Sequence, residues 1–171
     1  AFLIGVLLLG GTFRQLVAVV TAFTLAHSVT LALATLGWLV PPPRLIEPLL
    51  ALSIVAVAAE NLVALRSPLS TARVKASIAR RWRLTFGFGL VHGFGFAGAL
   101  RVLELPRALL APSLLTFNLG VELGQLVIVA LAWPLLRWAR GVPGMWPGGM
   151  RWASAAVAAL GIFWLVQRTV S

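Results

Sequence analysis

Residues 16–39 read LVAVVTAFTLAHSVTLALATLGWL, an apolar run that contains no Asp, Glu, Lys or Arg. A helix needs about 20 predominantly apolar residues to cross the hydrocarbon core of a bilayer. Backbone polar groups in lipid must all be paired within the spanning structure, so only helices and closed barrels cross it. The run lacks the strict alternation of a barrel strand and therefore predicts a transmembrane helix.

Similar runs occupy most of the remaining sequence, and Gly- and Pro-rich stretches separate them. Ten helical residues rise only about 15 Å, so a shorter run at the N-terminus predicts part of a first helix that begins upstream. The predicted fold is all-α, a polytopic transmembrane helix bundle with five full spans plus a partial first helix, and residues 1–171 form one domain. The predicted spans are 16–39, 46–65, 84–103, 109–137 and 152–168, after the partial segment 1–10.

The composition agrees with this class. Hydrophobic residues make up 60% of the chain and charged residues 11%, which leaves too few polar groups to cover a soluble domain. A net charge of +10 in a soluble protein would suggest nucleic-acid binding. Here the basic residues lie between apolar runs, so we expect contacts with lipid headgroups and no nucleic-acid partner. The absence of cysteine excludes disulfides and thiolate metal ligands.

Basic residues also predict the orientation of the bundle. When alternate connections are assigned to one side, that side receives most of the Lys and Arg residues, which marks it as cytoplasmic. The stretch 66–83 is predicted to be the longest loop and carries six positive charges. We expect it to lie on anionic lipids at the cytoplasmic face; a docking site for a cytoplasmic partner is the alternative.

Four ionisable residues lie inside the predicted spans and more than three residues from either end of a span: His27, Glu60, His92 and Glu122. An ionised side chain at the bilayer centre costs about 2.5–3.5 kcal/mol on insertion scales, so such residues face the bundle interior and commonly mark functional sites. Helical phase places other polar residues beside them, which predicts polar stripes that meet inside the bundle. These neighbours are Thr24 and Ser28 on the second span, Ser53 on the third, and Asn118 and Gln125 on the fifth.

Imidazole and carboxylate groups suit divalent transition metals such as nickel, cobalt, zinc or iron. Proton relay through His and Glu, haem ligation by His27 and His92, and a purely structural His–Glu network are the alternatives. The pairs Gly89-x-x-x-Gly93 and Gly120-x-x-x-Gly124 predict close helix packing rather than functional loops.

Four stretches resemble the HupE/UreJ family of hydrogenase and urease accessory membrane proteins, in order from about residue 16 to 137. The first runs from Thr21 through His27 to Leu31, and the second is Glu60-Asn61. The third is TFGFGLVHGFGFA at 85–97, and the fourth is FNLGVELGQ at 117–125. The family pattern also has a His and an Asp-His pair on the first membrane helix, upstream of residue 1, and this sequence contains no Asp.

The resemblance implies a multi-pass permease of the bacterial inner membrane whose cargo is a divalent transition metal, with nickel as the leading candidate. By position it implies metal ligands at His27, His92, Glu122, Glu60 and Asn118, and a substrate path along Thr24, Ser28, Asn61 and Gln125. We therefore expect a transporter and not an enzyme. The alternatives are a structural subunit with partner subunits in a membrane complex, and a membrane-embedded metal-dependent hydrolase.

Overall fold

The computed structural model describes the chain outside residues 67–69, 103–105, 144 and 171, and it leaves out the side chains of 70–75, 99–102 and 107. The described residues form helices and no strand, which confirms the all-α prediction. The helices are α1 (Phe2–Leu8), α2 (Phe13–Thr35), α3 (Pro43–Leu65), α4 (Ser70–Val102), α5 (Arg107–Gly141) and α6 (Met150–Val170), with a short π-helical turn at Met145–Gly149 before α6.

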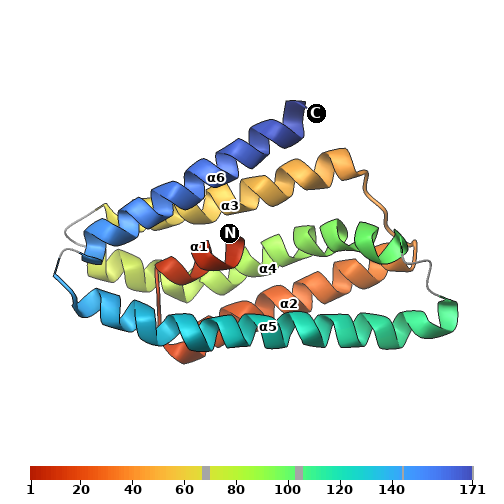
Figure 1. Cartoon of the computed structure of the whole chain (residues 1–171), viewed down its shortest axis with the longest axis horizontal. Coiled ribbons are helices and arrows are strands. Elements are labelled where there is room, and N and C mark those ends of the chain that lie inside the picture. The colour runs from red at the N-terminus through yellow and green to blue at the C-terminus, as the bar shows by residue number, and fades with distance from the viewer. Residues whose placement is uncertain (67–69, 103–105, 144, 171) are drawn as a thin grey trace.

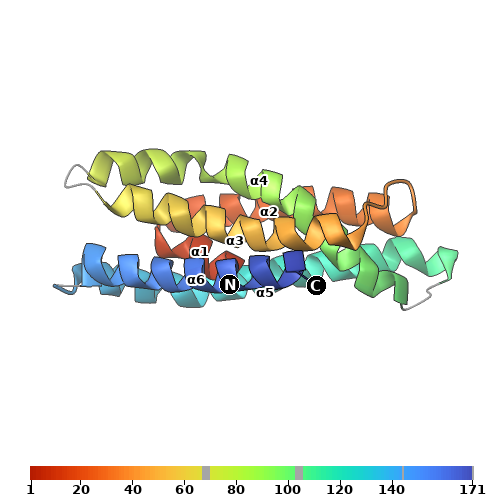
Figure 2. The same cartoon turned by 90° about the horizontal axis from the view of Figure 1, so that it is seen from above.

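The long helices lie side by side in one bundle (Figures 1 and 2). The helices α2 and α4 form the most extensive pair, α6 packs along α3, and α5 packs along α2. The short α1 contacts α3, α5 and α6, and its N-terminus lies midway along the bundle (Figure 1). The C-termini of α3 and α5 and the N-termini of α4 and α6 lie at one end of the bundle, and the C-termini of α2 and α4 and the N-termini of α3 and α5 lie at the other (Figure 1).

Four described helices are long and apolar enough to cross a membrane: Phe13–Thr35, Pro43–Leu65, Ala108–Gly141 and Met145–Val170. They correspond to four of the five predicted spans. The fifth predicted span, 84–103, lies in the second half of α4 and extends beyond the residues that the structure describes fully, so it is not in this set. The count of five full spans therefore stays a prediction.

The prediction of a long loop at 66–83 is wrong. Helix α4 begins at Ser70, so residues 70–83 of the basic segment are helical and continue directly into the second half of α4. Ser77, Arg81 and Thr85 lie one turn apart and are all buried, which makes one face of this basic helix an interior face. The sequence analysis predicted a loop because the segment is highly charged. Charge does not oppose a helix, however, since Ala, Arg and Lys are all good helix formers.

The ends of α2 explain why the helix is displaced from the predicted 16–39. At its start, Thr12 and Gln15 form a reciprocal capping box, in which each side chain accepts from the other residue's backbone N–H. At its end, Gly37 has a φ of +78°, a left-handed conformation that residues with a Cβ rarely adopt. The helix therefore stops at Thr35, and the apolar residues after it form a turn.

The close-packing prediction is confirmed for one glycine pair and not for the other. A Cβ on Gly89 would meet the carbonyl oxygen of Phe23, and one on Gly93 would collide with the hydroxyl of Thr30 and the carbonyl oxygen of His27. These glycines let α4 lie directly against the α2 backbone. A Cβ on Gly120 or Gly124 would meet no described atom within 4 Å.

Candidate functional site

His27 lies in the middle of α2 and is 1% exposed. Its ring is surrounded by aromatic rings, with centroid distances of 5.9 Å to Phe23, 5.4 Å to Phe96 and 6.3 Å to Phe117. Among the described residues, neither Nδ1 nor Nε2 has a hydrogen-bond partner. Buried polar atoms without partners are rare and costly, so this imidazole is a candidate ligand for a group that binds from outside the chain.

His92 on α4 approaches the same aromatic cluster. The ring of Phe23 lies 5.2 Å from it and 5.9 Å from His27, so one phenyl ring contacts both imidazoles. The Nε2 atom of His92 lies 3.0 Å from the hydroxyl of Ser53 on α3. Because Ser53 donates its only proton to the carbonyl of Leu50, we assign the proton of this contact to Nε2 of His92. The assignment leaves Nδ1 as the nitrogen with a free lone pair.

His92 is also reached by a cavity. A hollow of about 240 Å³ is lined by His92, Glu47, Trp164 and Arg168, together with apolar residues of α3. A neighbouring hollow of about 480 Å³ at the same end shares Glu47 and Arg168. Arg168 of α6 forms an ion pair with Glu47 at 2.5 Å, and both side chains are more than 40% exposed. Sequence reasoning did not single out Glu47, which lies in the second turn of α3, close to the end of the bundle.

The polar stripes of α2 and α5 meet, as predicted. The hydroxyl of Thr21 donates to Glu122 at 2.9 Å, and that of Thr24 donates to Gln125 at 3.1 Å. Two other predicted site residues bond within their own helices. The Ser28 hydroxyl donates to the Thr24 carbonyl, and the Asn118 side-chain NH₂ donates to the Leu114 carbonyl. The Oδ1 atom of Asn118 is buried and has no partner among the described residues.

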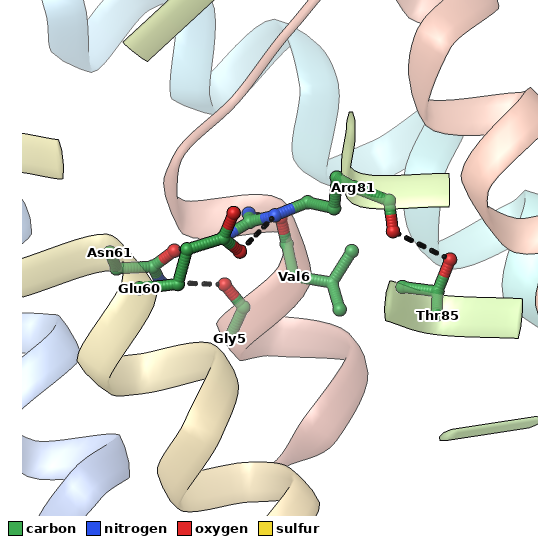
Figure 3. Close-up of polar contacts among 6 residues, drawn as sticks. All are labelled: Gly5, Val6, Glu60, Asn61, Arg81 and Thr85. Atoms are coloured by element: carbon green, nitrogen blue, oxygen red, sulfur yellow. Dashed lines mark hydrogen bonds and ion pairs between the residues drawn. The ribbon is translucent and has the colours of Figure 1, made fainter. Parts of the chain in front are cut away.

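Glu60 and Asn61 belong to a separate network around Arg81 (Figure 3). Arg81 donates to the Glu60 carboxylate at 3.0 Å, to Oδ1 of Asn61, and to the carbonyl of Val6 in α1. Asn61 in turn donates to the carbonyl of Gly5 at 2.8 Å. The Arg81 side chain is only 2% exposed, and its charge is balanced by the carboxylate and by two further acceptors.

Arginine side chains also bind the carboxyl ends of α1 and α3. Besides Arg81, which binds Val6, Arg140 donates to the carbonyl of Leu9 after α1, and Arg151 donates to that of Leu65 at the end of α3. The last carbonyls of a helix lack intrahelical partners and carry partial negative charge, which guanidinium groups compensate. Sequence reasoning counted these residues only as topology signals. The usable clue was Glu60, since a carboxylate inside a span requires a cation nearby.

The predicted site residues therefore fall into three groups. His27 and His92 share the aromatic cluster, Glu122 and Gln125 bond to α2 threonines, and Glu60 and Asn61 bind Arg81. Within the described part of the chain, no three His, Asp or Glu residues come together as a metal cluster. The described residues offer two imidazoles, fewer than the four protein ligands of a closed structural metal site.

A known protein family matches almost the whole chain. The sequence model of the family described as HupE / UreJ protein matches residues 1–168. The chain belongs to the HupE/UreJ family. No curated protein and no solved structure matches it.

Family membership confirms the resemblance and extends it from the central stretches to nearly the whole chain. Together with four helices long and apolar enough to cross a bilayer, it makes the chain a membrane protein of the HupE/UreJ family. In this member, the motif around His27 builds the aromatic cluster. The Glu60-Asn61 motif instead holds α1, α3 and α4 together through Arg81.

Proposed function

We propose that this HupE/UreJ protein passes a divalent transition metal across the bacterial inner membrane, with nickel as the leading cargo and cobalt, zinc or iron as alternatives. The metal binds transiently to His27 and His92 between α2 and α4. The observation that carries the proposal is the buried His27 ring, whose two nitrogens have no partner among the described residues. Neutral imidazole is the commonest protein ligand for metals of this class.

An incomplete ligand set suits cargo better than a resident ion. A structural zinc site closes four ligands around the metal and holds it tightly. Two imidazoles leave coordination positions of the metal open for water or for a further ligand, so the ion can dissociate. Asn118, with its buried and unpartnered Oδ1, and Glu122 belong to α5, the helix that also carries Phe117 against the His27 ring. A small movement of α5 would add an oxygen ligand.

The cavity beside His92 supports a route from one end of the bundle. Glu47 lines the cavity and provides a carboxylate that attracts cations, while Arg168 neutralises it in this state. We propose that this end faces away from the cytoplasm and that the end with the α3–α4 connection faces the cytoplasm. Thr24, Ser28 and Gln125 then lie along the proposed path, whereas Asn61 serves the Arg81 network.

The experiment that tests this proposal measures metal entry into proteoliposomes loaded with a nickel-sensitive dye. We expect His27→Ala and His92→Ala each to reduce nickel entry at least tenfold. Ser154→Ala is the matched control, because Ser154 is also a buried residue whose hydroxyl lacks a partner among the described residues, but it lies on α6. Nickel entry at the wild-type rate in both histidine variants would contradict the proposal.

A structural subunit of a larger membrane complex is the second candidate. The open face of α5 at Gly120 and Gly124 favours it, because small residues in membrane helices commonly pack against another helix. Stable co-purification with a partner subunit, combined with no metal entry by the wild-type protein, would select this function instead.

A further inference from the structure

A large hollow lies at the end of the bundle opposite Glu47. Its volume is about 780 Å³, and it lies between the α1–α2 turn and the last two turns of α5. Gly10 and Gly11 line it from the turn, Ile78 from α4, and Trp133, Arg137 and Arg140 from α5. A second hollow of about 570 Å³ shares Trp133 and Arg137 and continues to Trp138. Arg137 therefore lines both hollows, and we refer to the two hollows together as the groove.

The chemistry of this groove selects an anion. Arg137 and Arg140 both line it, and among the described residues no carboxylate lines either hollow. Arg140 is held in place, because it donates to the Leu9 carbonyl at 2.8 Å and lies over the Trp146 ring. Arg137 lies 5.5 Å over the Trp133 ring and makes no hydrogen bond or ion pair to any described residue. Its five N–H donors are thus available to an acceptor from outside.

The groove is a poor exit for the proposed cation, since two guanidinium groups repel a divalent metal. Its position suits a lipid. It opens beside α5, whose Leu131, Leu135 and Trp138 are all more than 60% exposed. Tryptophan collects at the level of the headgroups in membrane proteins, and Trp133 and Trp138 line the groove. Basic pockets between helices at the cytoplasmic side are known binding places for anionic headgroups.

We propose that this groove binds the phosphate of an anionic phospholipid, with Arg137 as the principal ligand and Arg140 as the fixed second cation. Arginine binds phosphate oxygens through two parallel N–H donors, and the indole under Arg137 keeps the guanidinium plane oriented. This site is distinct from the predicted lipid contact of segment 66–83, in which Arg81 is internal and Arg80 and Arg83 are exposed.

The test uses the delipidated whole protein in mixed micelles, with lipid binding measured by native mass spectrometry. Phosphatidylglycerol and phosphatidylcholine are the two lipid probes, and inorganic phosphate is the soluble probe. We expect the wild type to prefer phosphatidylglycerol. Arg137→Gln should weaken that binding about fivefold or more, since each basic residue near an anionic surface contributes on this scale. Arg137→Lys should keep part of the binding because it keeps the charge.

Arg83→Gln is the matched control, because Arg83 is also exposed and lies 5.5 Å over a tryptophan ring, that of Trp82, outside the groove. Unchanged phosphatidylglycerol binding in this variant, together with weakened binding in Arg137→Gln, supports the groove as the site. Equal losses in the Arg83→Gln and Arg137→Gln variants would overturn the site, and so would no loss in either. Binding of inorganic phosphate without preference for phosphatidylglycerol over phosphatidylcholine would overturn the lipid as the source of the phosphate.

Discussion

The two buried polar centres of this protein differ in how far their hydrogen-bonding groups are satisfied. The guanidinium of Arg81 meets a carboxylate, an amide oxygen and a backbone carbonyl. The imidazole of His27 is equally buried and meets only aromatic rings among the described residues. A buried network whose hydrogen bonds are all made stabilises one arrangement of helices. A buried group that lacks hydrogen bonds can instead bind a partner from outside the chain. The first centre is structural, and the second is where we propose that cargo binds.

The largest expected effect on stability comes from Arg81→Met. The substitution leaves the Glu60 carboxylate without its counter-charge and removes the bond to α1, so we expect a loss of roughly 3–5 kcal/mol in the free energy of unfolding. Unfolding in a denaturing detergent series, followed by circular dichroism, measures the loss.

Arg80→Met is the control for that substitution, because Arg80 is adjacent and exposed. Replacing Glu60 and Arg81 together by Met should recover part of the loss, since no charge then remains unpaired. A single Arg81→Met variant as stable as the control would mean that the network is not structural.

Gly93→Ala should have the next largest effect. The new methyl group would collide with the backbone of α2 at His27, and backbone cannot rotate aside. Overpacking of this kind costs about 1–3 kcal/mol. Gly120→Ala is the matched substitution on an open helix face and should cause no loss. Equal thermal stability of the two alanine variants in the same detergent would contradict the close approach of α2 and α4.

Thr21→Val should have a smaller effect. It removes the hydroxyl that donates to Glu122 while it keeps the volume of the side chain. Hydrogen bonds between membrane helices average about 0.6 kcal/mol, so we expect a shift of that size. A double-mutant cycle with Glu122→Gln isolates the contribution of this contact, and a coupling near zero would show that the two side chains do not depend on each other.

His27→Leu should have the smallest effect on stability and a large effect on transport. The leucine side chain removes two buried nitrogens without partners and fills an apolar cage, so the melting temperature should stay within a few degrees of wild type. Nickel entry should fall at least tenfold in the same preparation. A strong loss of stability would instead assign His27 to a structural network and would remove the contrast with Arg81.

The helices were largely predictable because each apolar run is long enough to span lipid. The errors lay where charge and helical structure coincide. The basic segment 66–83 suggested a loop, yet α4 runs through it from Ser70, since nothing in its residues opposes a helix. Spacing alone was also insufficient: Gly120-x-x-x-Gly124 has the same spacing as Gly89-x-x-x-Gly93, and among the described residues only Gly89 and Gly93 lie closely against another helix.

The sequence predicted which polar residues are buried in the bundle, but it did not predict which of them lie together. Depth in the membrane placed His27, Glu60, His92 and Glu122 inside the bundle, but depth does not specify the angle at which each helix faces its neighbours. Glu60 faces Arg81 and Glu122 faces Thr21, so neither side chain bonds to a histidine. Arg137 and its groove had no sequence signal beyond charge, because a hollow is a property of several helices at once.

The sequence by itself determined the membrane class, the helical content and the identity of the polar residues that must be buried, because hydrophobic length and the cost of unpaired groups in lipid act on each segment separately. Only the tertiary structure decided which buried group meets which. Rotation of a helix about its axis costs little in lipid and is set by side-chain packing, such as the contact of Gly93 with α2. That packing satisfies Arg81 and leaves His27 without a partner among the described residues.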